Sequence, residues 1–210
     1  MKINWYGQTC FRINTQVEKG KTVDILIDPF FDKGSGTRGP KLDADILMVS
    51  QDGQEAVSGR YFSITGPGEY DVKGVYIQGI GGDTNSDKKE RTTIYTIETE
   101  DMRLCHLGIL GQNELSSNQL EKINEVDILM LPVGGSKSLD AKKAVKVMSQ
   151  IEPKIIIPMY YKVPKIKTKL DKIDSFLKEL GIKSLKLLPK LNIKAKDLPK
   201  DEAKIIVLKA

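Results

Sequence analysis

The sequence is poor in the side chains that most often hold a transition metal. Its 210 residues include one histidine, His106, and two cysteines, Cys10 and Cys105, that stand far apart in the chain. Two such cysteines form neither a disulfide framework nor the paired spacing of a structural zinc site. Because little cysteine and no disulfide framework are typical of a reducing compartment, we expect a cytoplasmic protein.

Long apolar runs are missing as well. The longest, Ile155–Ile157 and Ile205–Leu208, are far shorter than the roughly 20 residues that a membrane-spanning helix needs. The first residues, Met1–Trp5, lack the apolar core of a signal peptide. Apolar residues make up 40% and charged residues 29% of the chain, as in ordinary globular proteins. We therefore expect one globular domain over residues 1–210 and no membrane partner.

Arginine is scarce, whereas lysine is abundant and concentrated near the C-terminus. Only five Arg occur in the chain, and residues 162–210 hold fourteen Lys against six Asp plus Glu. A basic region can meet phosphates, although bidentate recognition of phosphates and bases usually employs arginine. Nucleic-acid binding thus stands beside a merely solvated lysine-rich surface. A protein partner or a small anionic ligand is also compatible with the sequence.

The first half of the chain is typical of β-strands. Residues 22–27 alternate between apolar and polar side chains and end at Asp28–Pro29, and residues 45–49 form an apolar run. A loop rich in glycine, residues 30–42, separates these two segments. Further strands are expected at 2–6, 11–14, 61–64, 91–98 and 102–107, and in the stretch 69–80, which turns at Lys73–Gly74.

The second half alternates between helices and strands. Ser116 and Gln119 have the spacing of a capping box, and Asp140 is suited to cap a second helix. A third helix is expected over 167–180, where apolar residues recur on one face and Gly181 follows. Strands are expected at 127–131, 154–157, 184–188 and 204–208. Strands followed by such an alternation favour two packed sheets with helices outside.

A colinear series of short motifs runs from residue 1 to about residue 162. It includes Trp5–Phe11, Asp45–Ser50, Gly66–Val75, Cys105–Gly108 and Ile157–Tyr161. In order and spacing these motifs resemble the metallo-β-lactamase superfamily, in particular small bacterial metal-dependent hydrolases similar to ascorbate-6-phosphate lactonase. The resemblance implies an α/β fold, the αββα four-layer sandwich, with metals at the rim between the two sheets.

The same resemblance indicates that most of the family's metal ligands are replaced in this chain. Glycine, alanine and isoleucine have no donor atom, and tyrosine ligates only as a phenolate, with a reference pKa near 10. We therefore expect a degenerate metal site and no cofactor. The family's ligand positions fall on Gln51, Gly53, Glu55, Ala56, Gly82, Ile109 and Tyr160.

Several residues near the former site could still bind a metal or act in catalysis. Asp28, Asp52 and Glu55 together could hold magnesium or manganese, which prefer oxygen ligands. Asp28 could instead accept backbone N–H bonds from a neighbouring loop. His106 could act as a general base, or it could be a histidine at a strand end that hydrogen-bonds a loop carbonyl.

Two functional hypotheses follow. The first is a pseudoenzyme, a non-catalytic binding or scaffolding protein with the family's fold. The alternative is a hydrolase of the superfamily with a remodelled metal site, acting on a phosphodiester, an ester or a lactone. In that case the catalytic candidates are His106, Glu55 and Asp52. Whether the chain is an enzyme remains open at the level of the sequence.

Overall fold

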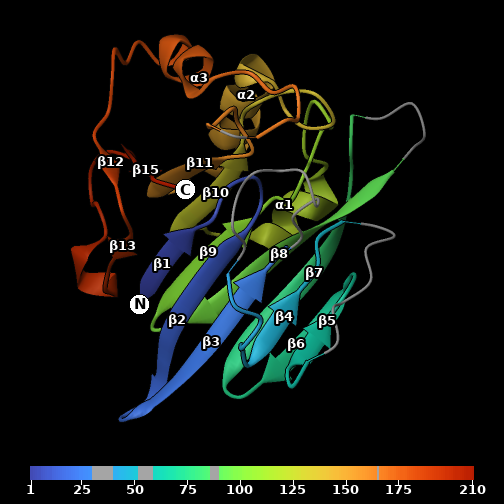
Figure 1. Cartoon of the computed structure of the whole chain (residues 1–210), viewed down its shortest axis with the longest axis vertical. Helices are drawn as coiled ribbons and strands as arrows, with labels where there is room; N and C mark the ends of the chain where they lie inside the picture. The colour runs from blue at the N-terminus through green and yellow to red at the C-terminus, as the bar shows by residue number, and fades with distance from the viewer. Residues whose placement is uncertain (30–39, 52–58, 86–89, 165) are drawn as a thin grey trace.

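Two β-sheets pack face to face in this computed structural model, which describes the chain except for residues 30–39, 52–58, 86–89 and 165 (Figure 1). The first sheet comes mainly from the N-terminal strands and the second from the middle of the chain. The helices lie on the outer side of the second sheet or against one another. This is the two-sheet arrangement with outer helices that the order of predicted elements indicates.

The first sheet contains strands from both ends of the chain. Its order is β13 (Leu191–Asn192), β1 (Lys2–Trp5), β2 (Phe11–Glu18), β3 (Lys21–Ile27), β4 (Ile46–Met48) and β5 (Phe62–Ile64). β3, β4 and β5 run parallel, while β13, β1, β2 and β3 are joined antiparallel.

The second sheet is longer and also mixed. Its order is β14 (Lys204–Ile205), β11 (Ile155–Met159), β10 (Ile128–Pro132), β9 (Met102–His106), β8 (Arg91–Thr99), β7 (Val75–Asp83) and β6 (Gly68–Val72). β9, β10, β11 and β14 run parallel. β12 (Leu187–Leu188) and β15 (Val207–Leu208) form a small separate pair. The carboxyl ends of parallel strands meet at one edge of a sheet, which places the residues that follow β9, β10 and β11 together.

Two of the three predicted helices begin where their caps were expected. α1 (Ser117–Ile123) is opened by a capping box, in which Gln119 N donates to Ser116 Oγ at 3.3 Å and Ser116 N donates to Gln119 Oε1 at 2.9 Å. α2 (Ala141–Ile151) is capped by Asp140, whose Oδ1 accepts a bond from Lys143 N at 3.0 Å. A 3₁₀ turn, η1 (Ala195–Asp197), lies near the C-terminus.

The third helix is shorter than predicted, because tertiary contacts hold its first residues in another conformation. α3 spans Ile173–Glu179 and not 167–180. Asp171 N donates to Gly134 O at 2.9 Å, and Asp171 O accepts a bond from Lys162 N at 2.8 Å. Because these backbone groups are committed to distant partners, the helix begins only after them, and α3 then packs against α2.

The core lies between the sheets and beneath the helices. The main cluster of buried apolar residues extends from Ile3 to Leu208, and Tyr95 and Phe11 are among its largest members. A second, small cluster contains Cys10, Leu26 and Leu47. Along β2, Phe11 and Ile13 are buried while Asn14 and Gln16 are exposed, which is the alternation of a strand with one face in a core. Among the described residues, no helix is long and apolar enough to cross a membrane.

Candidate functional site at the rim of the sandwich

The two sheets are joined at one rim by hydrogen bonds between Ser50 and the beginning of β8. Ser50 follows β4 in the first sheet, and its carbonyl oxygen accepts bonds from Thr93 N at 2.7 Å and Thr92 Oγ1 at 3.0 Å. Gln51 forms an isolated bridge to Thr92. This rim is where the resemblance places the family's metal ligands.

Asp28 holds the loop that follows β4. Its Oδ1 accepts a bond from Ser50 N at 2.7 Å, and its Oδ2 accepts one from Ser50 Oγ at 2.5 Å. The side chain is only 2% exposed, so both charge-assisted bonds are shielded from water. The bond to Ser50 N is the backbone N–H interaction expected for Asp28, and it commits both carboxylate oxygens to the framework.

His106 is held in one tautomer from both sides. The ring is fully buried; its Nε2 lies 2.9 Å from Thr9 O, and its Nδ1 accepts a bond from Gly108 N at 3.2 Å. Since a carbonyl can only accept, Nε2 carries the proton and the imidazole is neutral. Burial lowers the pKa of His106, and the nearby charge of Asp28 opposes this effect. The hydrogen bond to a loop carbonyl is thus present, and neither nitrogen keeps a lone pair for a metal or a substrate proton.

The two thiols near the rim are protonated at neutral pH. Cys10 and Cys105 are both free and buried. Burial raises the pKa of Cys10, as does the charge of Asp28, and burial raises the pKa of Cys105 to about 12. Neither cysteine is therefore poised as a nucleophile or as a thiolate ligand.

Three of the positions to which the resemblance assigns metal ligands lie around Thr92, a residue that the sequence did not single out. Gln51 pairs with Thr92, and Ile109 N donates to Thr92 Oγ1 at 3.3 Å. A Cβ atom on Gly82 would lie 3.4 Å from Thr92 Cγ2 and 2.9 Å from Leu110 Cδ1. Apolar side chains therefore occupy the space where a larger residue at position 82 would begin.

Tyr160 lies on a neighbouring part of the rim. It follows β11 with a positive φ of 52°, and its N donates to Gln8 O at 3.0 Å. Burial raises the pKa of Tyr160, and the charge of Glu90 raises it further, so the phenol stays protonated. The remaining positions, Asp52, Gly53, Glu55 and Ala56, lie outside the described residues.

The residues that organise this rim are hydroxyl-bearing ones that sequence patterns identify poorly. Thr9, Ser50 and Thr92 are all buried, and each accepts or donates a hydrogen bond that crosses between elements. Of the three, only Ser50 carried a signal, because it directly follows a predicted buried strand.

A family model described as a beta-lactamase superfamily domain matches residues 2–160 of the chain. A UPF0173 protein of Pyrococcus abyssi is 28% identical over 187 residues, covering 77% of this chain and 83% of that protein. A protein named UPF0173 metal-dependent hydrolase, from Methanopyrus kandleri, is 23% identical over 222 residues, covering 87% and 94%.

Solved structures extend the similarity over nearly the whole chain. A Thermotoga maritima protein, described as a candidate Zn-dependent hydrolase of the metallo-β-lactamase superfamily, superposes with a TM-score of 0.76 at 32% identity, covering 99% and 98% of the two chains. An isothiocyanate hydrolase from Delia radicum gut bacteria has a TM-score of 0.67 at 13% identity over 93% of this chain, which is evidence of the fold alone.

These names correct the expectation that the chain has no cofactor. Relatives that align over most of its length are named as metal-dependent, so the family implies a metal. They also favour the hydrolase alternative over the pseudoenzyme hypothesis, for which they provide no support.

The described residues do not by themselves fit that metal. Within the part of the chain that the structure describes, no group of three or more His, Cys, Asp or Glu side chains could hold an ion. Asp28 and His106 are already committed to Ser50, Thr9 and Gly108. The architecture, the family model and the Thermotoga structure nevertheless agree over most of the chain, which belongs to the metallo-β-lactamase superfamily.

Proposed function

We propose that this chain is a hydrolase of the metallo-β-lactamase superfamily with a remodelled rim, acting on a phosphodiester, an ester or a lactone. The observation that carries the proposal is the near-complete superposition on the Thermotoga protein, at 32% identity and 99% coverage of this chain. Relatives named as metal-dependent hydrolases add support.

In this proposal the described rim residues supply the framework of the site. The Asp28–Ser50 pair fixes the loop after β4, and the His106–Thr9 bond fixes the segment between β1 and β2. Because the side chains of Asp28 and His106 are buried and paired, these two residues orient the rim and take no part in proton transfer. The acidic candidates left by the sequence are Asp52 and Glu55.

The test combines metal analysis with activity. Protein purified without chelator is analysed for bound zinc, manganese, iron and magnesium, and is assayed with phosphodiester, ester and lactone substrates. We expect a near-stoichiometric metal and activity toward one substrate class. Glu55→Ala should abolish that activity, whereas the matched control Glu202→Ala, at an exposed position far along the chain, should retain it.

His106→Ala completes the experiment because it separates a framework role from a chemical one. A framework role predicts lower stability and a proportional loss of folded, active protein, with an unchanged pH profile of the remaining activity. Activity that is unchanged in both the Glu55 and the His106 variants would remove the remodelled-site hypothesis.

A second candidate function is a non-catalytic binding protein. The specific observation in its favour is the apolar packing at Gly82 and Ile109, where the family's ligand positions offer no donor atom. It predicts a protein that retains its fold but turns over no substrate of the panel even after incubation with each metal.

A further inference from the structure

The outer face of the first sheet is polar along strands β13, β1 and β2, and no described α-helix covers it there, whereas on β3 and β4 Leu26 and Leu47 belong to a small buried apolar cluster. The helices contact the second sheet and one another, and the strands of the first sheet lie on the other side of the sandwich (Figure 1). On strands β13, β1 and β2, the outward residues are those that alternate with the buried ones. We call the following set the open face: Lys190, Asn192, Lys194, Lys2, Asn4, Asn14 and Gln16.

The strand register places these residues in neighbouring rows. Lys2 pairs with Asn192 on one side and with Asn14 on the other, so the three side chains lie on the same face. Residues 190 and 194 are each two positions from Asn192, and burial alternates strictly from 190 to 194. Lys190 and Lys194 therefore share this face with Lys2.

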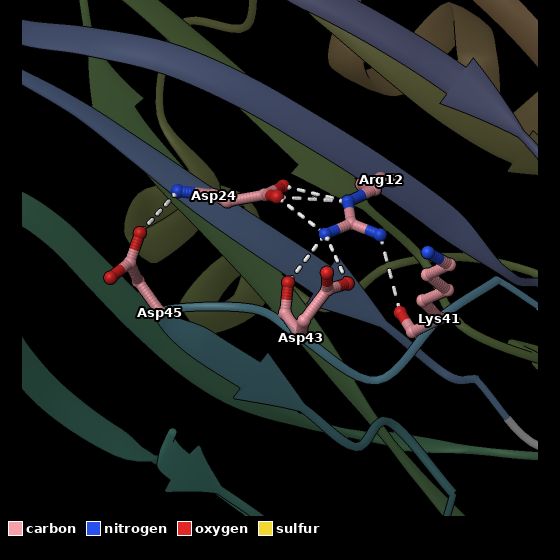
Figure 2. A network of polar contacts seen from close by, with 5 residues as sticks. All are labelled: Arg12, Asp24, Lys41, Asp43 and Asp45. Atoms are coloured by element: carbon pink, nitrogen blue, oxygen red, sulfur yellow. Dashed lines mark hydrogen bonds and ion pairs between the residues drawn. The ribbon is translucent and has the colours of Figure 1, made fainter. Parts of the chain in front are cut away.

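Several acidic residues around the open face are engaged in ion pairs with basic groups. Figure 2 shows that the guanidinium of Arg12 binds Asp24 through Nε, at 3.0 and 2.9 Å, and through Nη2 at 2.6 Å. The same guanidinium contacts Asp43 Oδ1 at 3.0 Å. Asp45 pairs with Lys73 at 2.5 Å, a contact outside the view of that figure. At the other border, the Met1 ammonium binds Glu100 at 2.7 Å.

The lysines and the asparagine amides of the open face, in contrast, have no side-chain partner within the described residues, whereas Gln16 Nε2 donates to Glu18 O at 3.2 Å. No ion pair involves Lys2, Lys190 or Lys194, and no hydrogen bond occupies the side-chain amides of Asn4, Asn14 or Asn192 in that part of the chain. Residues 190–200 as a whole carry four Lys and one Asp. The edge formed by β13 and β1 thus presents unpaired positive charge and free amide donors.

We propose that the open face binds the phosphate backbone of a nucleic-acid duplex without reading its sequence. Lysine ammonium groups attract phosphates as point charges, and asparagine amides donate hydrogen bonds to phosphate oxygens. Single strands are usually held by stacking on aromatic side chains, and the open face has none. The extended chain from Lys190 to Lys194, four residue-to-residue steps, spans about 13 Å, which corresponds to about four phosphates along one strand of a duplex.

The test measures binding of a fluorescein-labelled 30-base-pair DNA duplex by anisotropy from 50 to 200 mM salt. Three phosphate contacts predict a slope of about −2.7 in log affinity against log salt, which is a loss of about forty-fold over this range. Lys190→Gln combined with Lys194→Gln should weaken binding and reduce the slope to about −0.9, so that the same change in salt costs only about three- to four-fold. These lysines are exposed, so the variant should remain folded.

The matched control carries the same charge change elsewhere. Lys178→Gln combined with Lys183→Gln alters two exposed lysines on and just after α3, and should bind the duplex as the unmodified protein does. Equal weakening by both pairs would overturn the proposal, because it would reveal a diffuse attraction to all lysines. No affinity at 50 mM salt would also overturn it, as would equal competition by poly-glutamate or preferential binding of single-stranded RNA.

Discussion

The rim, where the two sheets meet, and the open face of the first sheet place their polar side chains in opposite situations. At the rim, Asp28 and His106 are buried and each is paired from two directions. On the open face, Asn14 and Lys190 are exposed and have solvent as their partner. Because a buried polar group that loses its partner stays unsatisfied, we expect substitutions at the rim to cost stability and those on the open face to cost little.

The largest effect is expected for Asp28→Ala. The variant leaves Ser50 N and Ser50 Oγ buried without an acceptor, which should lower the free energy of unfolding by about 3 kcal/mol. Urea unfolding measures this change, with Asp24→Ala as the control. Asp24 bonds to Arg12 near the surface, so its removal should cost below about 1 kcal/mol. Similar losses of unfolding free energy in the two variants would show that burial does not determine how much each region contributes to stability.

The second-largest loss of stability is expected from close packing around Gly82 at the rim. Gly82→Val should lower the free energy of unfolding by about 2 kcal/mol, because the new side chain meets Leu110, Ile94 and Thr92. The neighbouring Gly81 provides the control, since nothing lies within 4 Å of a Cβ atom placed there. Gly81→Val should leave stability nearly unchanged in the same urea titration, and a loss equal to that of Gly82→Val would contradict the close packing.

The single histidine, His106, should make the stability of the folded protein depend measurably on pH. Below pH about 6.5 an unfolded chain protonates its histidine, whereas burial lowers the pKa of His106 in the folded state. The unfolded state then binds more protons, so stability should fall with decreasing pH by up to about 1.4 kcal/mol per pH unit. Urea unfolding between pH 7 and 5.5 measures this slope. The slope should vanish in His106→Asn, and stability that rises on acidification would refute the assignment.

The smallest effect is expected on the outer side of the first sheet. Arg12→Lys keeps the charge but loses the bidentate contact with Asp24, and should cost below about 1 kcal/mol. High salt should reduce the difference between the variant and the unmodified protein, because partly exposed ion pairs are screened. A loss comparable to that of Asp28→Ala would mean that this network is as important to stability as the buried rim.

Local patterns predicted most elements correctly. The strands around 45–49, 127–131 and 154–157 are continuous apolar runs, and both capped helices begin at the expected residues. The late start of α3 was not predictable, because it depends on backbone bonds from Asp171 to distant residues. β13 was missed for a similar reason, since a two-residue strand is defined only by its partner β1.

In the candidate site, too, features set by local sequence could be predicted and those set by tertiary contacts could not. The backbone bond accepted by Asp28 was foreseeable because Asp28 stands between a strand and Pro29. The role of Thr92 was not, because it comes from contacts between the two sheets. Replacement of the ligand positions stays a prediction from the resemblance, and the expectation of no cofactor was wrong, since relatives similar over most of their length are named as metal-dependent.

Both sheets obtain an outermost strand from the last twenty residues, β13 beside β1 and β14 beside β11. While the chain is being synthesised, one edge of β1 and one edge of β11 therefore stay unpaired. Unpaired strand edges are the surfaces through which strands of different molecules associate. The outer edges of β1 and β11 are therefore paired only after residues 191–205 have been added. A chain that stops before residue 190 should accumulate as aggregate and leave no smaller stable domain.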